Sequence, residues 1–179
     1  IAVTGSLGAA AGGLALSRLQ AGRAAEALSQ PWGRALIQAL ERPVARLGEA
    51  QVLARAGASA MMDLSDGLTK DLSRLCDASG VGARVDLGAV PVSGPLASGA
   101  ALLGVDARSL ALSGGEDYEL LVTMPADGVG RARDELQTGF GVDLSELGEV
   151  TEGSGLIGVD AEGRETVLDA AGWDHFAGG

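Results

Sequence analysis

An apolar run of strand length that leads through an acidic turn into a helical pattern is the feature that most constrains this chain. Residues 59–64 form the run, and residues 66–78 have amphipathic helical periodicity that ends at Ser79 and Gly80. Between them lies Asp-Leu-Ser-Asp-Gly, at residues 63–67. This order predicts polar side chains at the carboxyl end of a strand and the start of a helix, so the fold must combine sheet and helix.

Further strands and helices alternate without the regular spacing of βαβ units. We expect a closing hairpin and other strands, at residues 147–151 with 155–159, and at 1–4, 83–87 and 118–124. Pro31 and Pro43 break the helical regions, which we expect at residues 9–20, 33–40, 44–56, 95–103 and 126–137. The pattern predicts one α+β (mixed α/β) domain over residues 1–179, with a mixed β-sheet flanked by helices.

The charge balance excludes some classes of partner. The net charge is −11, and Lys70 is the only lysine among 13 basic residues. Sequence-independent binding to nucleic acid or to an anionic membrane needs a basic face, so we expect neither partner. Aromatic residues make up 3% of the chain, so the core must pack through small side chains. No apolar run reaches the 18 residues that a membrane-spanning helix needs.

Cys76 is the only cysteine, which rules out an intrachain disulfide and favours a reducing, cytoplasmic location. It falls in an apolar helical pattern, so we expect a buried structural thiol rather than a nucleophile. The chain starts without an initiator methionine or a basic signal region. We therefore expect it to be part of a longer protein.

The acidic turn can support magnesium and phosphate chemistry. Carboxylates at Asp63 and Asp66 are the hard oxygen ligands that Mg²⁺ prefers, and Ser65 at a helix start suits phosphate oxygens. The alternative is that Asp or Ser simply caps the helix. Further along the helix, we expect Asp71 and Asp77 to be solvated rather than catalytic.

A second acidic cluster, Ser-Gly-Gly-Glu-Asp-Tyr-Glu, occupies residues 113–119 before a predicted strand. Its three carboxylates repel one another unless cations or hydrogen-bond donors offset them. Glu116 is the best candidate for a substrate contact, and Asp117 for holding the loop by hydrogen bonds. A solvated turn is the alternative.

Two other segments have open interpretations. Gly-Ser-Leu-Gly at residues 5–8 suggests a phosphate loop but matches no standard motif, and tight helix packing explains it better. Trp173 lies in a tail that either pins the terminus to the core or stacks on a flat heterocycle. The only histidine is His175, so the sequence supports neither a Ser-His-Asp triad nor a zinc site.

Four motifs, taken in order, carry a resemblance to a known family. They are Val-Thr-Gly-Ser-Leu-Gly at residues 3–8, Asp-Leu-Ser-Asp-Gly-Leu at 63–68, Ala-Leu-Ser-Gly-Gly-Glu-Asp-Tyr-Glu-Leu at 111–120, and Gly-Trp-Asp-His-Phe at 172–176. Together they resemble the thiamine-monophosphate kinases, which belong to the superfamily of aminoimidazole ribonucleotide synthetase. The resemblance covers the whole chain and the C-terminal half of the family's usual length.

The resemblance implies a reaction and roles for five residues. It implies Mg-dependent transfer of the γ-phosphate of ATP to thiamine monophosphate, which gives thiamine diphosphate. By the same resemblance, Asp63 and Asp66 bind Mg²⁺, Ser65 contacts ATP, and Glu116 and Trp173 contact thiamine monophosphate. Catalysis would rest on positioning and electrostatics, so no general base is expected.

The resemblance also implies that the chain lacks part of the machinery. The family's N-terminal half, an ATP-binding and dimerisation domain, carries most of the magnesium-binding aspartates and is absent here. We therefore expect a homodimer for the full-length protein and no kinase activity for this chain alone. The open alternatives are another superfamily member, of the selenophosphate synthetase, hydrogenase-maturation or purine-synthetase type, or a non-catalytic binding or scaffold domain.

Overall fold

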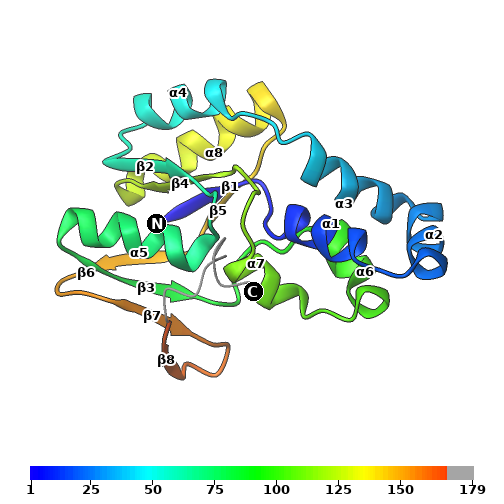
Figure 1. Cartoon of the computed structure of the whole chain (residues 1–179). Coiled ribbons are helices and arrows are strands. Elements are labelled where there is room, and N and C mark those ends of the chain that lie inside the picture. Colours follow the sequence, from blue (N-terminus) through cyan, green and yellow to red (C-terminus); the bar gives the residue numbers. More distant parts are fainter. Residues whose placement is uncertain (169–179) are drawn as a thin grey trace.

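The strands within residues 1–168, the part of the chain that the structure describes, form two four-stranded sheets in a computed structural model (Figure 1). The first sheet has the order β2-β4-β1-β5 and is antiparallel throughout. The second has the order β6-β3-β7-β8 and is mixed, because β3 pairs with β7 in parallel. The strands are β1 Ala2–Thr4, β2 Ala60–Asp63, β3 Gly82–Asp86, β4 Leu120–Thr123, β5 Leu144–Glu146, β6 Gly148–Thr151, β7 Leu156–Val159 and β8 Glu165–Val167.

The helices cover the sheets in groups. Helices α4 and α8 lie on one face of the antiparallel sheet, and α5 lies between the two sheets (Figure 1). Helices α1, α2, α3 and α6 form a separate group beside the sheets (Figure 1). The helices are α1 Ala9–Ser17, α2 Ala21–Ser29, α3 Pro31–Glu41, α4 Leu47–Arg55, α5 Leu68–Ser79, α6 Gly94–Leu103, α7 Ala107–Ser113 and α8 Ala126–Phe140.

Strand β4 shows why the antiparallel sheet is covered on both faces. Its side chains alternate between faces, as the pleat of a strand requires. Leu121 packs in the core beneath α5, whereas Leu120 and Val122 pack in the core against α4 and α8. Three successive apolar residues, 120–122, place apolar side chains on both faces of the strand, and the two cores bury both faces.

The α+β class with a mixed sheet is confirmed, and an antiparallel sheet accompanies the mixed one. The expected hairpin of residues 147–151 and 155–159 is wrong, because β6 and β7 do not pair with each other. Both pair with β3, which lies between them. The sequence did not predict four of the elements, which are helices α2 and α7 and strands β5 and β8. Among the described residues, no helix is long and apolar enough to cross a bilayer.

Candidate functional site

The antiparallel pairing of β2 with β4 brings the two acidic motifs together. In this pairing Asp63 lies opposite Leu120, so the end of β2 lies beside the start of β4. Three backbone hydrogen bonds extend the ladder into the two loops: Leu64 N to Glu119 O at 2.8 Å, Tyr118 N to Leu64 O at 2.9 Å, and Glu116 N to Ser65 O at 2.9 Å. The residues predicted to contact metal and ATP, at positions 63–66, therefore lie beside Glu116, one of the two predicted substrate contacts.

Glycines allow this close approach of the two loops. A Cβ on Gly115 would lie 2.3 Å from the carbonyl oxygen of Ser65, and one on Gly67 would lie 2.7 Å from that of Ser113. Gly67 also has a φ of +110°, a conformation that side chains disfavour. Any larger residue at either position would push the loops apart.

Asp63 and Asp66 have different surroundings. Asp63 is exposed at the end of β2, whereas Asp66 is half-buried and forms ion pairs with Arg74 at 2.5 Å and Lys70 at 3.4 Å. Burial of Asp66 opposes its ionisation, but the hydrogen bonds from Arg74 and Lys70 outweigh this effect and lower its pKa below the usual value. Asp66 is therefore an anion at neutral pH.

The oxygen atoms of this turn fit a hard cation in their chemistry. Asp63 and Asp66 offer carboxylates and Ser65 offers a hydroxyl, and Asp66 already attracts two positive side chains. Within residues 1–168, no group of three or more acidic, His or Cys side chains gathers as a metal site. Two carboxylates would leave most positions around Mg²⁺ to phosphate oxygens and water, as is usual for this ion.

Asp71 corrects a sequence prediction, because its side chain is fully buried rather than solvated. The backbone N–H groups of Ser65 and Asp66 donate to its Oδ2 at 3.0 and 2.9 Å, and Arg74 donates to its Oδ1 at 3.1 Å. The physical reason lies in the helix start. The backbone N–H groups of the turn before the N-cap Gly67 point toward α5, where the Asp71 carboxylate accepts them. Asp77, by contrast, is exposed as expected.

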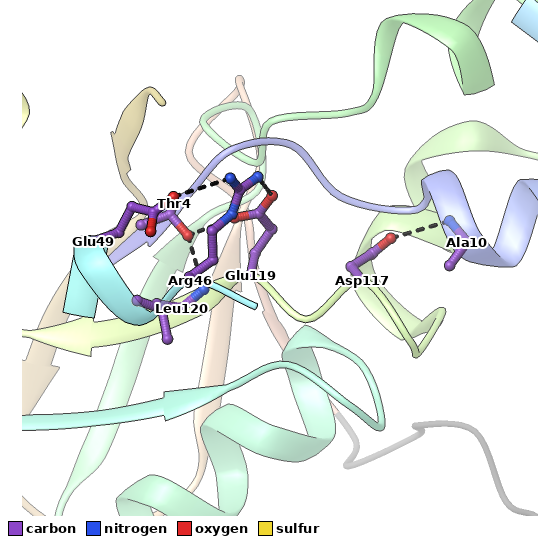
Figure 2. A network of polar contacts seen from close by, with 7 residues as sticks. All are labelled: Thr4, Ala10, Arg46, Glu49, Asp117, Glu119 and Leu120. Carbon is purple, nitrogen blue, oxygen red and sulfur yellow. Dashed lines mark hydrogen bonds and ion pairs between the residues drawn. The ribbon is translucent and has the colours of Figure 1, made fainter. Parts of the chain in front are cut away.

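Glu119, the last carboxylate of the second motif, is held by a buried network (Figure 2). Arg46 donates to its two oxygens at 2.9 and 2.6 Å, and the Thr4 hydroxyl donates at 2.6 Å. Arg46 also donates to Glu49 at 3.1 Å, and its hydrogen bond to Glu119 raises the pKa of the guanidinium. Sequence reasoning missed Arg46 because 73 positions separate it from Glu119, and no local pattern marks the pair.

Asp117 has the hydrogen-bonding role that we predicted, but its partners in the glycine-rich loop at residues 5–8 and in α1 were not predicted (Figure 2). Its carboxylate accepts the N–H groups of Gly8 at 2.6 Å and Ala10 at 3.2 Å, at the start of α1. Burial, with a smaller contribution from the charge of Glu119, raises its pKa to about 6, and the N–H donors offset only part of this rise. The helix start therefore already has an anionic partner within the chain.

Close packing accounts for the small residues that follow this loop. A Cβ on Gly13 would lie 2.3 Å from the carbonyl oxygen of Leu36 on α3, and one on Gly8 would lie 2.6 Å from the Leu96 side chain. The tight helix packing that we expected for this segment is therefore present at both glycines.

Glu116 and Tyr118 have left-handed backbone conformations, with φ of +70° and +52°. Such conformations cost about 1–3 kcal/mol each and cluster at functional sites. The Tyr118 hydroxyl donates to Glu116 at 2.9 Å, and this bond raises the pKa of the phenol.

A pocket of about 440 Å³ opens beside Glu116. Its walls are mostly apolar and come from α1, α3, α7 and the adjoining loops, with Leu14, Val105 and Leu110 among the apolar residues. Two charged residues, Arg18 and Glu116, also line it. This pocket can take a flat, largely apolar group with a positive charge near the Glu116 carboxylate. Trp173, the other predicted substrate contact, lies outside the described residues.

Comparisons with known proteins find relatives in the family that these motifs resemble. The thiamine-monophosphate kinase of Salmonella typhimurium is 40% identical over 182 residues, which cover 99% of this chain and 52% of that protein. The thiamine-monophosphate kinase of Aquifex aeolicus is 33% identical over 174 residues, with 97% and 50% covered. The chain thus spans about half the length of these relatives and is homologous to their C-terminal half.

Solved structures give the same result. "AaThiL complexed with AMPPCP and TMP" has a TM-score of 0.76 and 30% identity, and covers 98% of this chain and 50% of that one. The thiamine-monophosphate kinase from Stenotrophomonas maltophilia K279a has a TM-score of 0.74 and 33% identity, with 92% and 50% covered. The hydrogenase maturation protein HypE of E. coli, at 19% identity and a TM-score of 0.66, shares the fold alone. Residues 1–172 match the model of the "AIR synthase related protein, C-terminal domain", and the chain belongs to this family.

Proposed function

We propose that this chain forms one part of the active site of a thiamine-monophosphate kinase. The observation that carries the proposal is the contact between the acidic turn at residues 63–67 and the loop at 113–119, beside an apolar pocket that Glu116 lines. A phosphate-transferring enzyme must hold a metal nucleotide and its acceptor side by side, and these two loops adjoin. The homologous structure with AMPPCP and TMP supports the same two ligands.

Five residues have proposed roles. Asp63 and Asp66 hold Mg²⁺, and Ser65 contacts the phosphates of ATP. Glu116 and Trp173 hold thiamine monophosphate, whose thiazolium cation suits a carboxylate and an aromatic face. When bound, Mg²⁺ would neutralise the charge that develops on the transferred phosphoryl group.

The proposed reaction balances without a general base from these residues. A phosphate oxygen of thiamine monophosphate forms a bond to the γ-phosphorus of ATP. The bond from that phosphorus to the β,γ-bridging oxygen breaks, and ADP leaves with the electron pair. The attacking oxygen is already ionised near neutral pH, so the residues need only orient it and stabilise charge.

The proposed metal site needs more ligands than the described residues supply. Asp63 and Asp66 supply two carboxylates, and no larger acidic group gathers in residues 1–168. We infer that further metal ligands come from the rest of the full-length enzyme, which would be a cytoplasmic homodimer. This chain alone would then bind ligands without converting them, and thiamine diphosphate formed from Mg-ATP by the isolated chain would disprove that expectation.

Calorimetric titration of the chain with thiamine monophosphate tests the proposal. Glu116→Gln keeps an acceptor for the Tyr118 hydroxyl but removes the negative charge, so affinity should fall roughly tenfold. Glu152→Gln, on an exposed loop, is the matched control and should leave affinity unchanged. If the wild type prefers aminoimidazole ribonucleotide to thiamine monophosphate, or if Glu116→Gln binds as well as the control, the proposal fails.

A further inference from the structure

Asp71 is the one fully buried carboxylate of helix α5 in the described part of the chain, and its partners all belong to the acidic turn or its ion pairs. Its Oδ2 accepts the backbone N–H groups of both Ser65 and Asp66. Its Oδ1 accepts a hydrogen bond from Arg74, whose same Nη1 nitrogen also contacts Asp66. A single carboxylate thus links the backbone of the turn to the cation beside its acidic side chain.

The free-energy cost of burying a carboxylate explains why Asp71 needs all of these donors. A buried carboxylate without donors is costly, and three charge-assisted hydrogen bonds offset that cost. The same bonds fix the two N–H vectors of the turn. Gly67 gives the turn its left-handed φ of +110° but cannot itself restrain the residues before it.

We propose that Asp71 is a positioning residue that sets the backbone of Ser65 and Asp66 for binding of a magnesium nucleotide. In this proposal its carboxylate acts through the backbone of the turn and contacts neither ligand. The inference rests on the proposed function for the identity of the ligand, and on the hydrogen bonds of Asp71 for the mechanism.

The test compares Asp71→Asn with Asp77→Asn, an exposed aspartate on the same helix, in the 179-residue chain. Amide hydrogen exchange by NMR should be roughly tenfold or more faster at residues 65 and 66 in Asp71→Asn, with β4 amides unchanged. Titration should show that Asp71→Asn weakens Mg-AMPPCP binding roughly tenfold and leaves thiamine monophosphate binding unchanged. Asp77→Asn should match the wild type in both measurements.

A loss of Mg-AMPPCP affinity with unchanged thiamine monophosphate affinity would show that Asp71 positions the turn. A residue that only supports the fold would affect both ligands. Equal losses for both ligands, or unchanged exchange at residues 65 and 66, would overturn the inference. If the wild type binds neither ligand, the proposed function fails, and the exchange rates alone then decide whether Asp71 holds the turn.

One measurement uses only the wild-type chain, so it can be made even if Asp71→Asn does not fold. In wild-type chain, NMR couplings across the hydrogen bonds should connect the Ser65 and Asp66 amide nitrogens to the Asp71 carboxyl carbon. Their detection supports the inference, and their absence in an otherwise well-resolved spectrum contradicts it.

Discussion

At the scale of single residues, each carboxylate of the motif at residues 116–119 is balanced by a different kind of partner. Glu116 accepts a phenol hydroxyl, Asp117 accepts backbone N–H groups, and Glu119 pairs with an arginine. This division offsets most of the repulsion among three acidic residues within four positions, although the charge of Glu119 still contributes to the raised pKa of Asp117. It also makes them respond differently to pH and to substitution.

Asp117 should make the stability of the chain depend on pH. Its folded pKa of about 6 exceeds the ordinary pKa of 3.8, so protonation stabilises the folded state below pH 3.8. This stabilisation is lost as pH rises through 6, and it amounts to about 3 kcal/mol. Urea unfolding should show the wild type losing that much relative to Asp117→Asn between pH 3.5 and 7. Parallel pH profiles would contradict a raised pKa.

Arg46 should matter for stability far more than a surface arginine. Arg46→Met leaves the buried Glu119 and Glu49 without their cation, which should lower the free energy of unfolding by about 3 kcal/mol or more. Arg55→Met is the matched control, because Arg55 forms an ion pair on the surface. The Arg55 side chain is 60% exposed and that of its partner Glu135 is 47% exposed. The control should change stability by less than about 1 kcal/mol. If urea unfolding gave both variants the same change in free energy of unfolding, the buried network would stabilise the fold no more than a surface ion pair.

The same residues show what a sequence can and cannot predict about a site. Asp63, Ser65, Asp66 and Glu116 stand out in the sequence because each belongs to a short motif beside a strand. The structure brings these motifs together, and the roles of the four residues stay predictions. Asp71 was mistaken for a solvated residue, since its burial depends on how the turn folds back over α5. The partners of Glu119 come from distant segments, so only tertiary structure reveals them.

At the scale of elements, strand pairing assembles the site and helix packing supports it. The antiparallel β2-β4 pair joins two motifs that lie about fifty residues apart, and α1 brings its first turn to Asp117. Strong local patterns predicted β2, α5, β4 and α8. The order of the strands was not predictable, since β3 enters between β6 and β7 through contacts far apart in the sequence.

The contact between α1 and α3 offers a prediction for an element. Gly13→Ala would place a methyl group 2.3 Å from the Leu36 carbonyl oxygen, so the helices must separate. The free energy of unfolding should fall by about 1–3 kcal/mol. Gly22→Ala, with open space around its Cβ in α2, should instead raise it by up to about 1 kcal/mol. Urea unfolding of both variants checks this, and a neutral Gly13→Ala would refute close packing here.

At the scale of the whole molecule, the described residues form layers of sheet and helix, to which we assign one part of a larger active site. Two cores cover the antiparallel sheet, and the helical group adds a third. The proposed ligand-binding loops lie where these layers meet, so the domain can present them as a rigid surface. Its relatives are about twice as long, and the proposal assigns the remaining metal ligands to that extra length.

Activity in a chimera is the most direct test of the central claim. This chain would replace the matching 52% of the Salmonella typhimurium thiamine-monophosphate kinase, and thiamine diphosphate formation from Mg-ATP would be measured. The account predicts an active chimera whose turnover falls at least roughly a hundredfold in Asp63→Asn and Asp66→Asn, but not in Asp77→Asn. A folded chimera without activity, or full activity after both substitutions in the acidic turn, would contradict it.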